Sequence, residues 1–131
     1  MLSLRSVALV MLAAVTLISC RRDPATAKKQ YLDSGNKYFD RGRFKEARIQ
    51  YENALKVDPR FGPAHFKVAE VYMKITPANV SGALQHYERA ISLLAGNQAY
   101  QDEYYLSMVH ASDIYLTWAY RDKPSMDKVE G

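Results

Sequence analysis

Cysteine is almost absent from this chain, because the 131 residues include only Cys20. A single cysteine cannot form a disulfide within the chain, and it cannot supply a zinc site built from several thiolates. Histidine is scarce too, and His65, His86 and His110 show no spacing typical of metal ligands. There is also no glycine-rich loop of the kind that holds phosphate groups. We therefore expect no metal, no cofactor and no catalytic residues.

A large excess of one charge is also missing. The formal net charge is +4 at pH 7, and the basic residues are interleaved with acidic ones. No basic–aromatic motif of nucleic-acid-binding proteins occurs, so we expect no nucleic-acid partner. The more basic half, residues 21–60, is either a solvated helix face or a surface suited to an acidic partner or an anionic membrane.

Long apolar runs are lacking except at the N-terminus. Arg5 precedes a run of twelve residues, 7–18, which suits the core of a signal peptide. It is shorter than the roughly 20 residues that a membrane-spanning helix needs. The sequence Leu17-Ile18-Ser19-Cys20 follows directly and resembles the lipobox of bacterial lipoproteins. That resemblance implies cleavage before Cys20 and lipid attachment to its sulfur.

The lipobox resemblance also implies a location and two segments. Residues 1–19 would be the signal peptide, and residues 20–27 a short lipidated tether facing the periplasm. In similar lipoproteins an aspartate after the cysteine marks retention in the inner membrane. Arg21 stands there, which favours the outer membrane over the inner one. The alternative is an ordinary signal peptide cleaved at Ala25-Thr26-Ala27, which lies beyond two arginines and an aspartate.

Helical periodicity begins at about Lys28 and predicts five helices. Gly42 permits the first turn, and Asp58-Pro59 ends the second helix because proline disfavours helix at the preceding residue. We expect Thr76 to cap the fourth helix, with Pro77 as its first residue. The expected helices are 28–41, 44–57, 63–75, 77–94 and 100–120, with the start of a sixth at Lys123-Pro124.

Small and aromatic residues recur at a fixed period along these helices. The step is 34 residues in the first helix of each pair and 36 in the second, which indicates a longer turn in the second pair. Residues 111–115 echo residues 68–72 after a step of 43. The matched positions are Gly35 and Ala69, Tyr38 and Tyr72, Ala47 and Ala83, Tyr51 and Tyr87, and Ala54 and Ala90.

This pattern resembles the tetratricopeptide repeat (TPR). The resemblance implies an all-α fold of antiparallel helix pairs, stacked as a short right-handed solenoid and preceded by the signal peptide. Residues 28–61 would form the first repeat, 62–96 the second and 97–131 half of a third. Because about three repeats are usually needed to bury a continuous core, we expect either a truncated longer protein or completion against a partner.

The resemblance also assigns a binding surface. In this family the first helix of each pair lines a concave groove for a protein or peptide; the alternative for each such residue is plain solvated surface. Some members clamp the terminal carboxylate of chaperone tails, but only Asn36 fits that pattern here, so we do not expect that ligand. The assigned groove residues are Leu32, Asn36, Asp40, Phe66, Lys67, Glu70, Lys74, His110, Asp113 and Thr117.

The combined expectation is a membrane-anchored scaffold that binds protein in the cell envelope. Similar lipidated repeat proteins act in assembly, secretion or exopolysaccharide export. The alternative function is polysaccharide binding, in which aromatic rings of the last helix stack on sugars. Those rings would otherwise pack against a further repeat; they are Tyr100, Tyr104, Tyr105, Trp118 and Tyr120.

Overall fold

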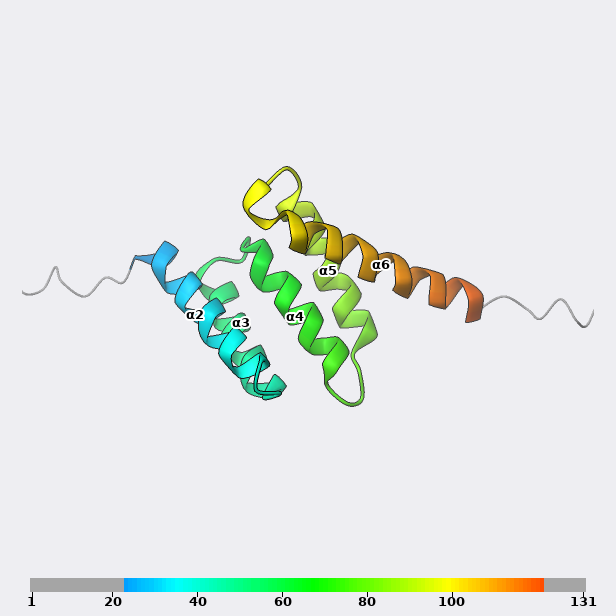
Figure 1. The fold of residues 1–131 in the computed structure, drawn as a ribbon, viewed down its shortest axis with the longest axis horizontal. Helices are drawn as coiled ribbons and strands as arrows, with labels where there is room; N and C mark the ends of the chain where they lie inside the picture. Colours follow the sequence, from blue (N-terminus) through cyan, green and yellow to red (C-terminus); the bar gives the residue numbers. More distant parts are fainter. Residues whose placement is uncertain (1–22, 122–131) are drawn as a thin grey trace, which may run out of the picture.

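The computed structural model describes residues 23–121, which fold into helices without any strand in that range (Figure 1). The signal peptide, Cys20, Arg21 and the helix expected at Lys123-Pro124 lie outside the described residues. The helices are α2 (Pro24–Phe39), α3 (Phe44–Val57), α4 (Gly62–Lys74), α5 (Val80–Leu94) and α6 (Gln101–Arg121), with a 3-10 turn η1 (Gln98–Tyr100) before α6.

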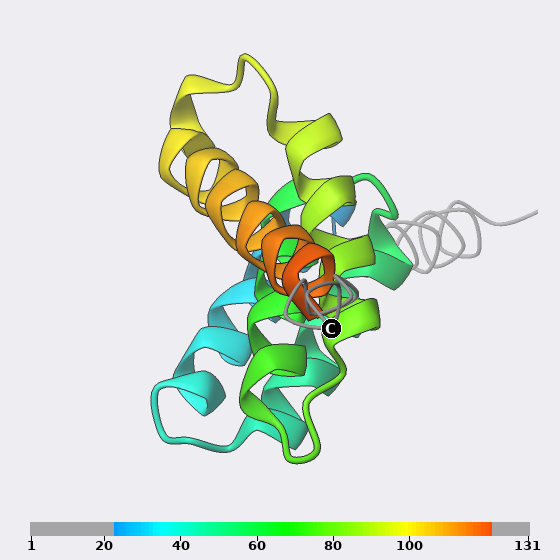
Figure 2. The same cartoon turned by 90° about the vertical axis from the view of Figure 1, so that its right-hand side faces the viewer.

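The helices stack in pairs. α2 packs against α3, α4 packs against α5, and α3 and α4 join the two pairs. α6 packs on α5 as the first helix of a third unit (Figure 2). This arrangement confirms the predicted all-α fold of stacked helix pairs. Within residues 23–121, no helix is both long enough and apolar enough to cross a membrane.

The first helix begins four residues before the predicted start at Lys28. The carboxylate of Asp23 accepts hydrogen bonds from the backbone N–H groups of Ala25, at 3.3 Å, and Thr26, at 3.1 Å. Pro24 at the first helical position has no backbone N–H that would need an acceptor. Asp23-Pro24 is therefore a favourable helix start. Lys28 Nζ, at the start of the second turn of α2, lies 2.5 Å from Asp58 Oδ2 and ties this end of the helix to the end of α3.

The predicted cap of the fourth helix at Thr76-Pro77 is wrong. α5 begins at Val80, and Asn79 caps it by accepting the backbone N–H of Gly82 at 3.0 Å. The backbone N–H of Asn79 also donates to the carbonyl of Tyr72 at 2.9 Å, which fixes the loop against the end of α4. Asparagine is a strong N-cap residue, and here it outcompetes the threonine three positions earlier.

The core is built from small residues facing tyrosines. Tyr51 and Tyr87 are 0% and 1% exposed. A Cβ atom added to Gly35 would lie only 2.3 Å from Tyr51 Cε1, so α2 and α3 approach as closely as glycine allows. The small residues at the repeated positions are all buried, which explains why these positions repeat: Gly35, Ala47, Ala54, Ala69, Ala83 and Ala90.

α6 repeats the packing of α4. Ala64, Val68 and Val71 face the first helix pair and are fully buried. The residues 43 positions later are Ser107, Ala111 and Ile114, and these are the buried residues of α6. The 43-residue step predicted from the sequence is therefore confirmed in three dimensions.

Candidate protein-binding groove

Two buried tyrosines hold the predicted groove residues in place. The hydroxyl of Tyr51 donates to Asn36 Oδ1 at 2.9 Å, and that of Tyr87 donates to Glu70 Oε1 at 2.6 Å. Asn36 and Glu70 stand at the same position of successive repeats, so one such bond forms in each repeat. Buried tyrosine hydroxyls require a partner, and in both repeats a groove residue provides it. Sequence reasoning missed this link, although the matched spacing of the two pairs was its signal.

The tyrosine hydroxyls remain donors at neutral pH. Burial raises the pKa of Tyr51, and the charges of Asp40 and Glu70 raise it further. Burial also raises the pKa of Tyr87, followed by its hydrogen bond to Glu70 and the charge of that carboxylate. Both phenols therefore stay protonated, and both bonds persist across the physiological range.

Glu70, Tyr87 and His110 form a cluster that joins α4, α5 and α6. His110 Nε2 lies 3.6 Å from Glu70 Oε1, and its ring lies 5.2 Å from the ring of Tyr87. The side chains of His110 and Glu70 are 40% and 23% exposed, so the cluster remains accessible to a partner. The pair is ionic only when His110 is protonated.

A hollow of about 350 Å³ adjoins this cluster. Three predicted groove residues, His110, Asp113 and Thr117, line it. The other lining residues were not predicted for the groove, because most of them come from the ends of α4 and α5 and from the face of α6 that packs on α5. They are Met73, Val80, Tyr87, Ile114, Trp118 and Arg121, which give the hollow an apolar floor and a polar rim.

Lys67 bridges the first two repeats. Its Nζ atom lies 5.6 Å from the ring centre of Phe39 on α2 and 5.3 Å from that of Phe66. Phe66 itself differs from the groove prediction, because it is only 4% exposed and belongs to the core beneath α5. The Phe66 ring is buried beside the ring of Tyr87, and only Lys67, the next residue, faces outward.

The remaining predicted groove residues lie nearer the edges of this surface. Leu32 is partly buried and packs against the core of the first pair. Asp40 is exposed at the C-terminal end of α2. Lys74 is exposed and lines a separate hollow beside the turn between α2 and α3. The structure thus gathers His110, Asp113 and Thr117 around one hollow and leaves Asp40 and Lys74 outside its lining.

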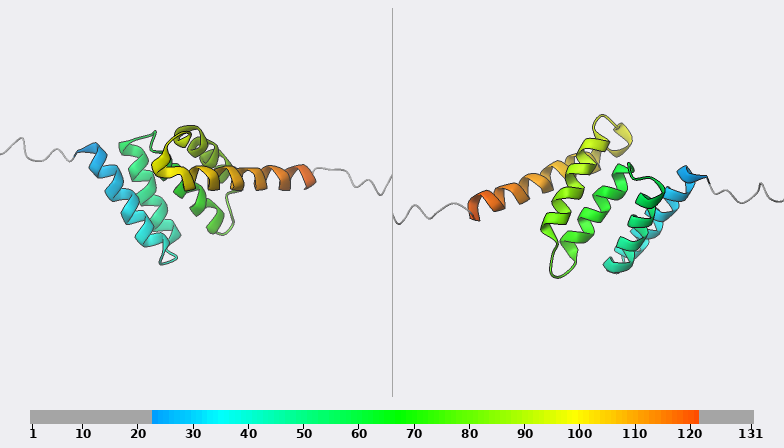
Figure 3. Two further views of the ribbon diagram at one scale, coloured as in Figure 1. Left: turned by 45° about the horizontal axis from the view of Figure 1, so that its top comes forward. Right: turned by 180° about the vertical axis from the view of Figure 1, so that it is seen from behind.

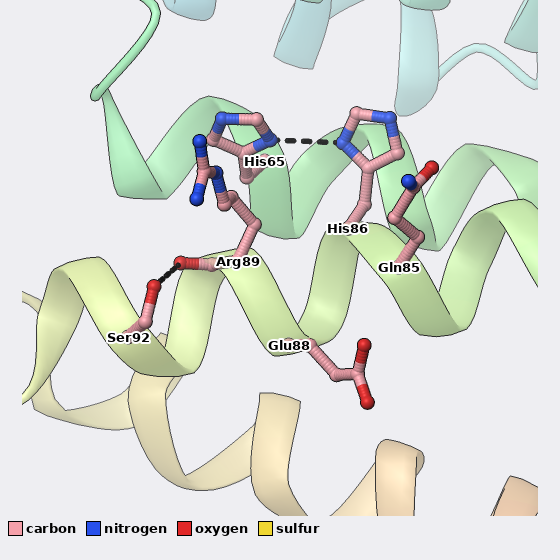
Figure 4. A pocket seen from close by; sticks show the side chains of 6 residues that line it. All are labelled: His65, Gln85, His86, Glu88, Arg89 and Ser92. Atoms are coloured by element: carbon pink, nitrogen blue, oxygen red, sulfur yellow. Dashed lines mark hydrogen bonds between the residues drawn. The ribbon is translucent and has the colours of Figure 1, made fainter.

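A histidine pair was not foreseen. His65 Nδ1 and His86 Nδ1 lie 2.9 Å apart beside a hollow of about 480 Å³ (Figure 4). His65 Nε2 lies 3.1 Å from the carbonyl oxygen of Pro59. The hydrogen bonds fit if a neutral His65 donates from Nε2 to Pro59 and accepts at Nδ1 from His86. The ring centroids of His65 and His86 lie 5.1 Å apart.

Burial sets the protonation state of the histidine pair. It lowers the pKa of His86 to about 4, with a further contribution from the charge of His65. Burial also lowers the pKa of His65. Arg89 lies beside His65, whereas Glu88 points away from the pair (Figure 4). Within residues 23–121, no group of three histidine, cysteine or acidic side chains could hold a metal ion.

Comparison with known families agrees with this architecture. Residues 35–75 match the family model described as TPR repeat, from Gly35 in α2 to the residue that follows α4. The match supports a TPR protein, a class whose members are typically scaffolds that bind other proteins and not catalysts. Comparisons with curated proteins and with solved structures find no match.

Proposed function

We propose that this chain is an envelope-anchored scaffold that binds a protein partner in the groove formed by α2, α4 and α6. TPR repeats generally mediate protein–protein interactions, which gives the chain its coarse role. The hollow beside Glu70, Tyr87 and His110 carries the finer proposal. It is concave and combines an apolar floor with a few polar groups, as peptide-binding sites do.

The chemistry of the hollow suggests what the partner presents. Met73 and Trp118 offer apolar surface, while Asp113 and Thr117 offer an acceptor and a hydroxyl at the rim. A partner segment would place an apolar side chain inward and its polar groups along the rim. Because Glu70 is already held by Tyr87, little ordering of the site is needed when a partner binds.

Polysaccharide binding is less well supported. Tyr100, Tyr104 and Trp118 pack against the core, so they cannot stack freely on sugars. Tyr105 and Tyr120 are exposed, but they lie on an apolar helix face. That face offers few hydrogen-bonding groups for sugar hydroxyls, and it suits a protein surface better.

Site-specific crosslinking tests the groove in the native envelope. A photoreactive residue at Thr117 should capture a protein partner, whereas one at Lys56 on α3 should not. Asp113→Lys should then reduce capture from position 117, because it reverses the charge at the rim. Glu52→Lys on α3 makes the same charge change as a matched control. Equal capture from positions 117 and 56 would count against the groove.

Cys20→Ser tests the anchor separately. Without a thiol for lipid attachment, the chain should no longer be processed as a lipoprotein. The readout is metabolic labelling of the chain with a fatty acid, which Cys20→Ser should abolish. Lipid labelling that persists would show that Cys20 is not the attachment site.

A further inference from the structure

A basic hollow lies at the end of the stack where α2 begins. The start of α2, the loop between α3 and α4 and the turn before α6 gather at this end, and the loops after α2 and α4 lie at the opposite end (Figures 1 and 3). The hollow has a volume of about 230 Å³, and its charged lining residues are Lys28, Lys29, Arg60 and Asp58. Three cations therefore surround one carboxylate.

The carboxylate of this lining is already occupied. Lys28 Nζ donates to Asp58 Oδ2 at 2.5 Å, and the backbone N–H of Arg60 donates to Asp58 Oδ1 at 2.9 Å. Neither the Lys29 nor the Arg60 side chain forms an ion pair within residues 23–121, and both residues are exposed. The acidic residues in the first turn of α6 do not line the hollow. Two exposed positive charges are thus left for an anionic partner.

The apolar part of the lining is closed to a partner. Phe61 and Leu94 are 5% and 2% exposed, and Lys28 Nζ covers the ring of Phe61 at 4.8 Å from its centre. A partner therefore meets the charged rim and does not insert an apolar side chain or an acyl chain. This favours a layer of anionic headgroups over a peptide with hydrophobic anchor residues.

Charge alone does not distinguish this end of the stack from the other. The hollow at the opposite end is also lined by three basic side chains and one acidic side chain, which are Arg43, Lys45, Lys74 and Glu46. The proposed lipid separates the two ends, because α2 begins only four residues after Cys20. Lys29 follows Pro24 by five residues, which is about 8 Å along the helix axis and comparable with the Debye length at physiological salt.

We infer that this end of the stack docks on anionic phospholipid headgroups, with Lys29 and Arg60 contacting their phosphates. The inference rests on the lipid anchor of the proposed function. One basic residue close to an anionic surface shifts the docking equilibrium about fivefold, so the two together shift it about 25-fold. Because α2 to α5 run between the two ends, docking stands them upright on the bilayer and turns the groove sideways (Figure 1).

Fluorescence quenching by lipid headgroups tests the docking in the mature lipidated chain. Cys20 is the one cysteine of the sequence, so lipid on its sulfur leaves an introduced cysteine as the only free thiol. Ala95→Cys carries the fluorophore beside Leu94 in the lining of the hollow, and Ala78→Cys carries it beyond the other end of α5. Both alanines are exposed, and the helix between them is about 22 Å long.

The vesicles contain phosphatidylglycerol, phosphatidylethanolamine and a phosphatidylcholine that carries a spin label on its headgroup as the quencher. Position 95 should be quenched and position 78 should not. Replacing phosphatidylglycerol with phosphatidylcholine should remove the quenching at position 95. Raising the salt to about 1 M should do the same, because the Debye length falls to about 3 Å.

Charge reversal identifies the residues that make the contact. Lys29→Glu with Arg60→Glu should lower the ratio of docked to undocked chain at least about 25-fold, because both headgroup contacts are lost. Lys37→Glu with Lys45→Glu makes the same change at exposed residues of the opposite end and should leave the ratio unchanged. Circular dichroism should show the parent helical content in both variants. Lys29→Gln with Arg60→Gln should lower the ratio less than the reversal does.

The anchor and the docking fail in different ways. A chain that does not float with the vesicles would refute the lipid anchor, and the docking with it. A chain that floats but is quenched equally at positions 95 and 78 would overturn the docking alone. Quenching at position 95 that survives the charge reversal at positions 29 and 60, or the loss of phosphatidylglycerol, would overturn it as well.

Discussion

A single methyl group at position 35 tests how closely the first helix pair is packed. A Cβ atom on Gly35 would lie 2.3 Å from Tyr51 Cε1, 2.5 Å from Cδ1 and 2.9 Å from Cζ. Carbon atoms in favourable contact are about 3.5–4.0 Å apart. The ring cannot move away easily, because Tyr51 is fully buried and its hydroxyl is bonded to Asn36. In Gly35→Ala, α2 and α3 must therefore separate.

The expected loss of stability is about 3 kcal/mol. Overpacking a core costs roughly 1–3 kcal/mol, and a clash with three ring atoms belongs at the upper end. A weakened Tyr51–Asn36 hydrogen bond adds about 1 kcal/mol. Alanine is a better helix former than glycine by about 1 kcal/mol, which offsets part of the loss. The net value is a large share of the 5–15 kcal/mol typical of folded domains.

Urea denaturation followed by circular dichroism measures the effect. Gly35→Ala should lower the midpoint concentration with little change in the slope m. In a Tyr51→Leu background the smaller side chain leaves room for the methyl group, so the same change should be neutral or stabilising. A Gly35→Ala chain as stable as the parent would refute the packing argument, and so would an equal penalty in both backgrounds.

Two further predictions concern the buried polar groups. Tyr87→Phe should destabilise the chain by roughly 1.5–3 kcal/mol, because it removes the hydrogen bond to the Glu70 carboxylate, while a loss below 0.5 kcal/mol in urea denaturation would contradict that role. Stability should also fall as the pH is lowered from about 6.5 to 4.5, above the range where most carboxylates titrate. The folded pKa of His86, about 4, and the lowered pKa of His65 mean that the unfolded chain binds protons first. His86→Phe should flatten this dependence in thermal melts, and an unchanged slope would argue against the histidine pair as its source.

The helix pairs could be predicted because their signal is periodic. Tyr51 and Tyr87 recur with the small residues that they contact, so the order and pairing of the helices follow from the sequence. The helix starts at Pro24 and Val80 could not be placed, because each depends on one capping side chain that is not among the repeated small and aromatic positions. Asp23 and Asn79 fix those starts through local hydrogen bonds that periodicity does not report.

The groove was predictable as a set of positions but not as a set of accessible side chains. Phe66 and Lys67 are neighbours at the edge of the same helix face, and packing against α5 turns the first inward and leaves the second outward. The roles of Asn36 and Glu70 as acceptors for buried tyrosines depend on a second helix. The contact between His65 and His86 likewise depends on how α4 and α5 meet.

The early start of α2 sets how far the groove can reach. With the lipid proposed at Cys20, only residues 21–23 separate the anchor from Pro24, and three extended residues span at most about 11 Å. The bond between Lys28 and Asp58 holds the N-terminal end of α2 to the rest of the stack, so this end of the helix does not lengthen the tether. A scaffold mounted in this way would select partners by their height above the bilayer as well as by their shape.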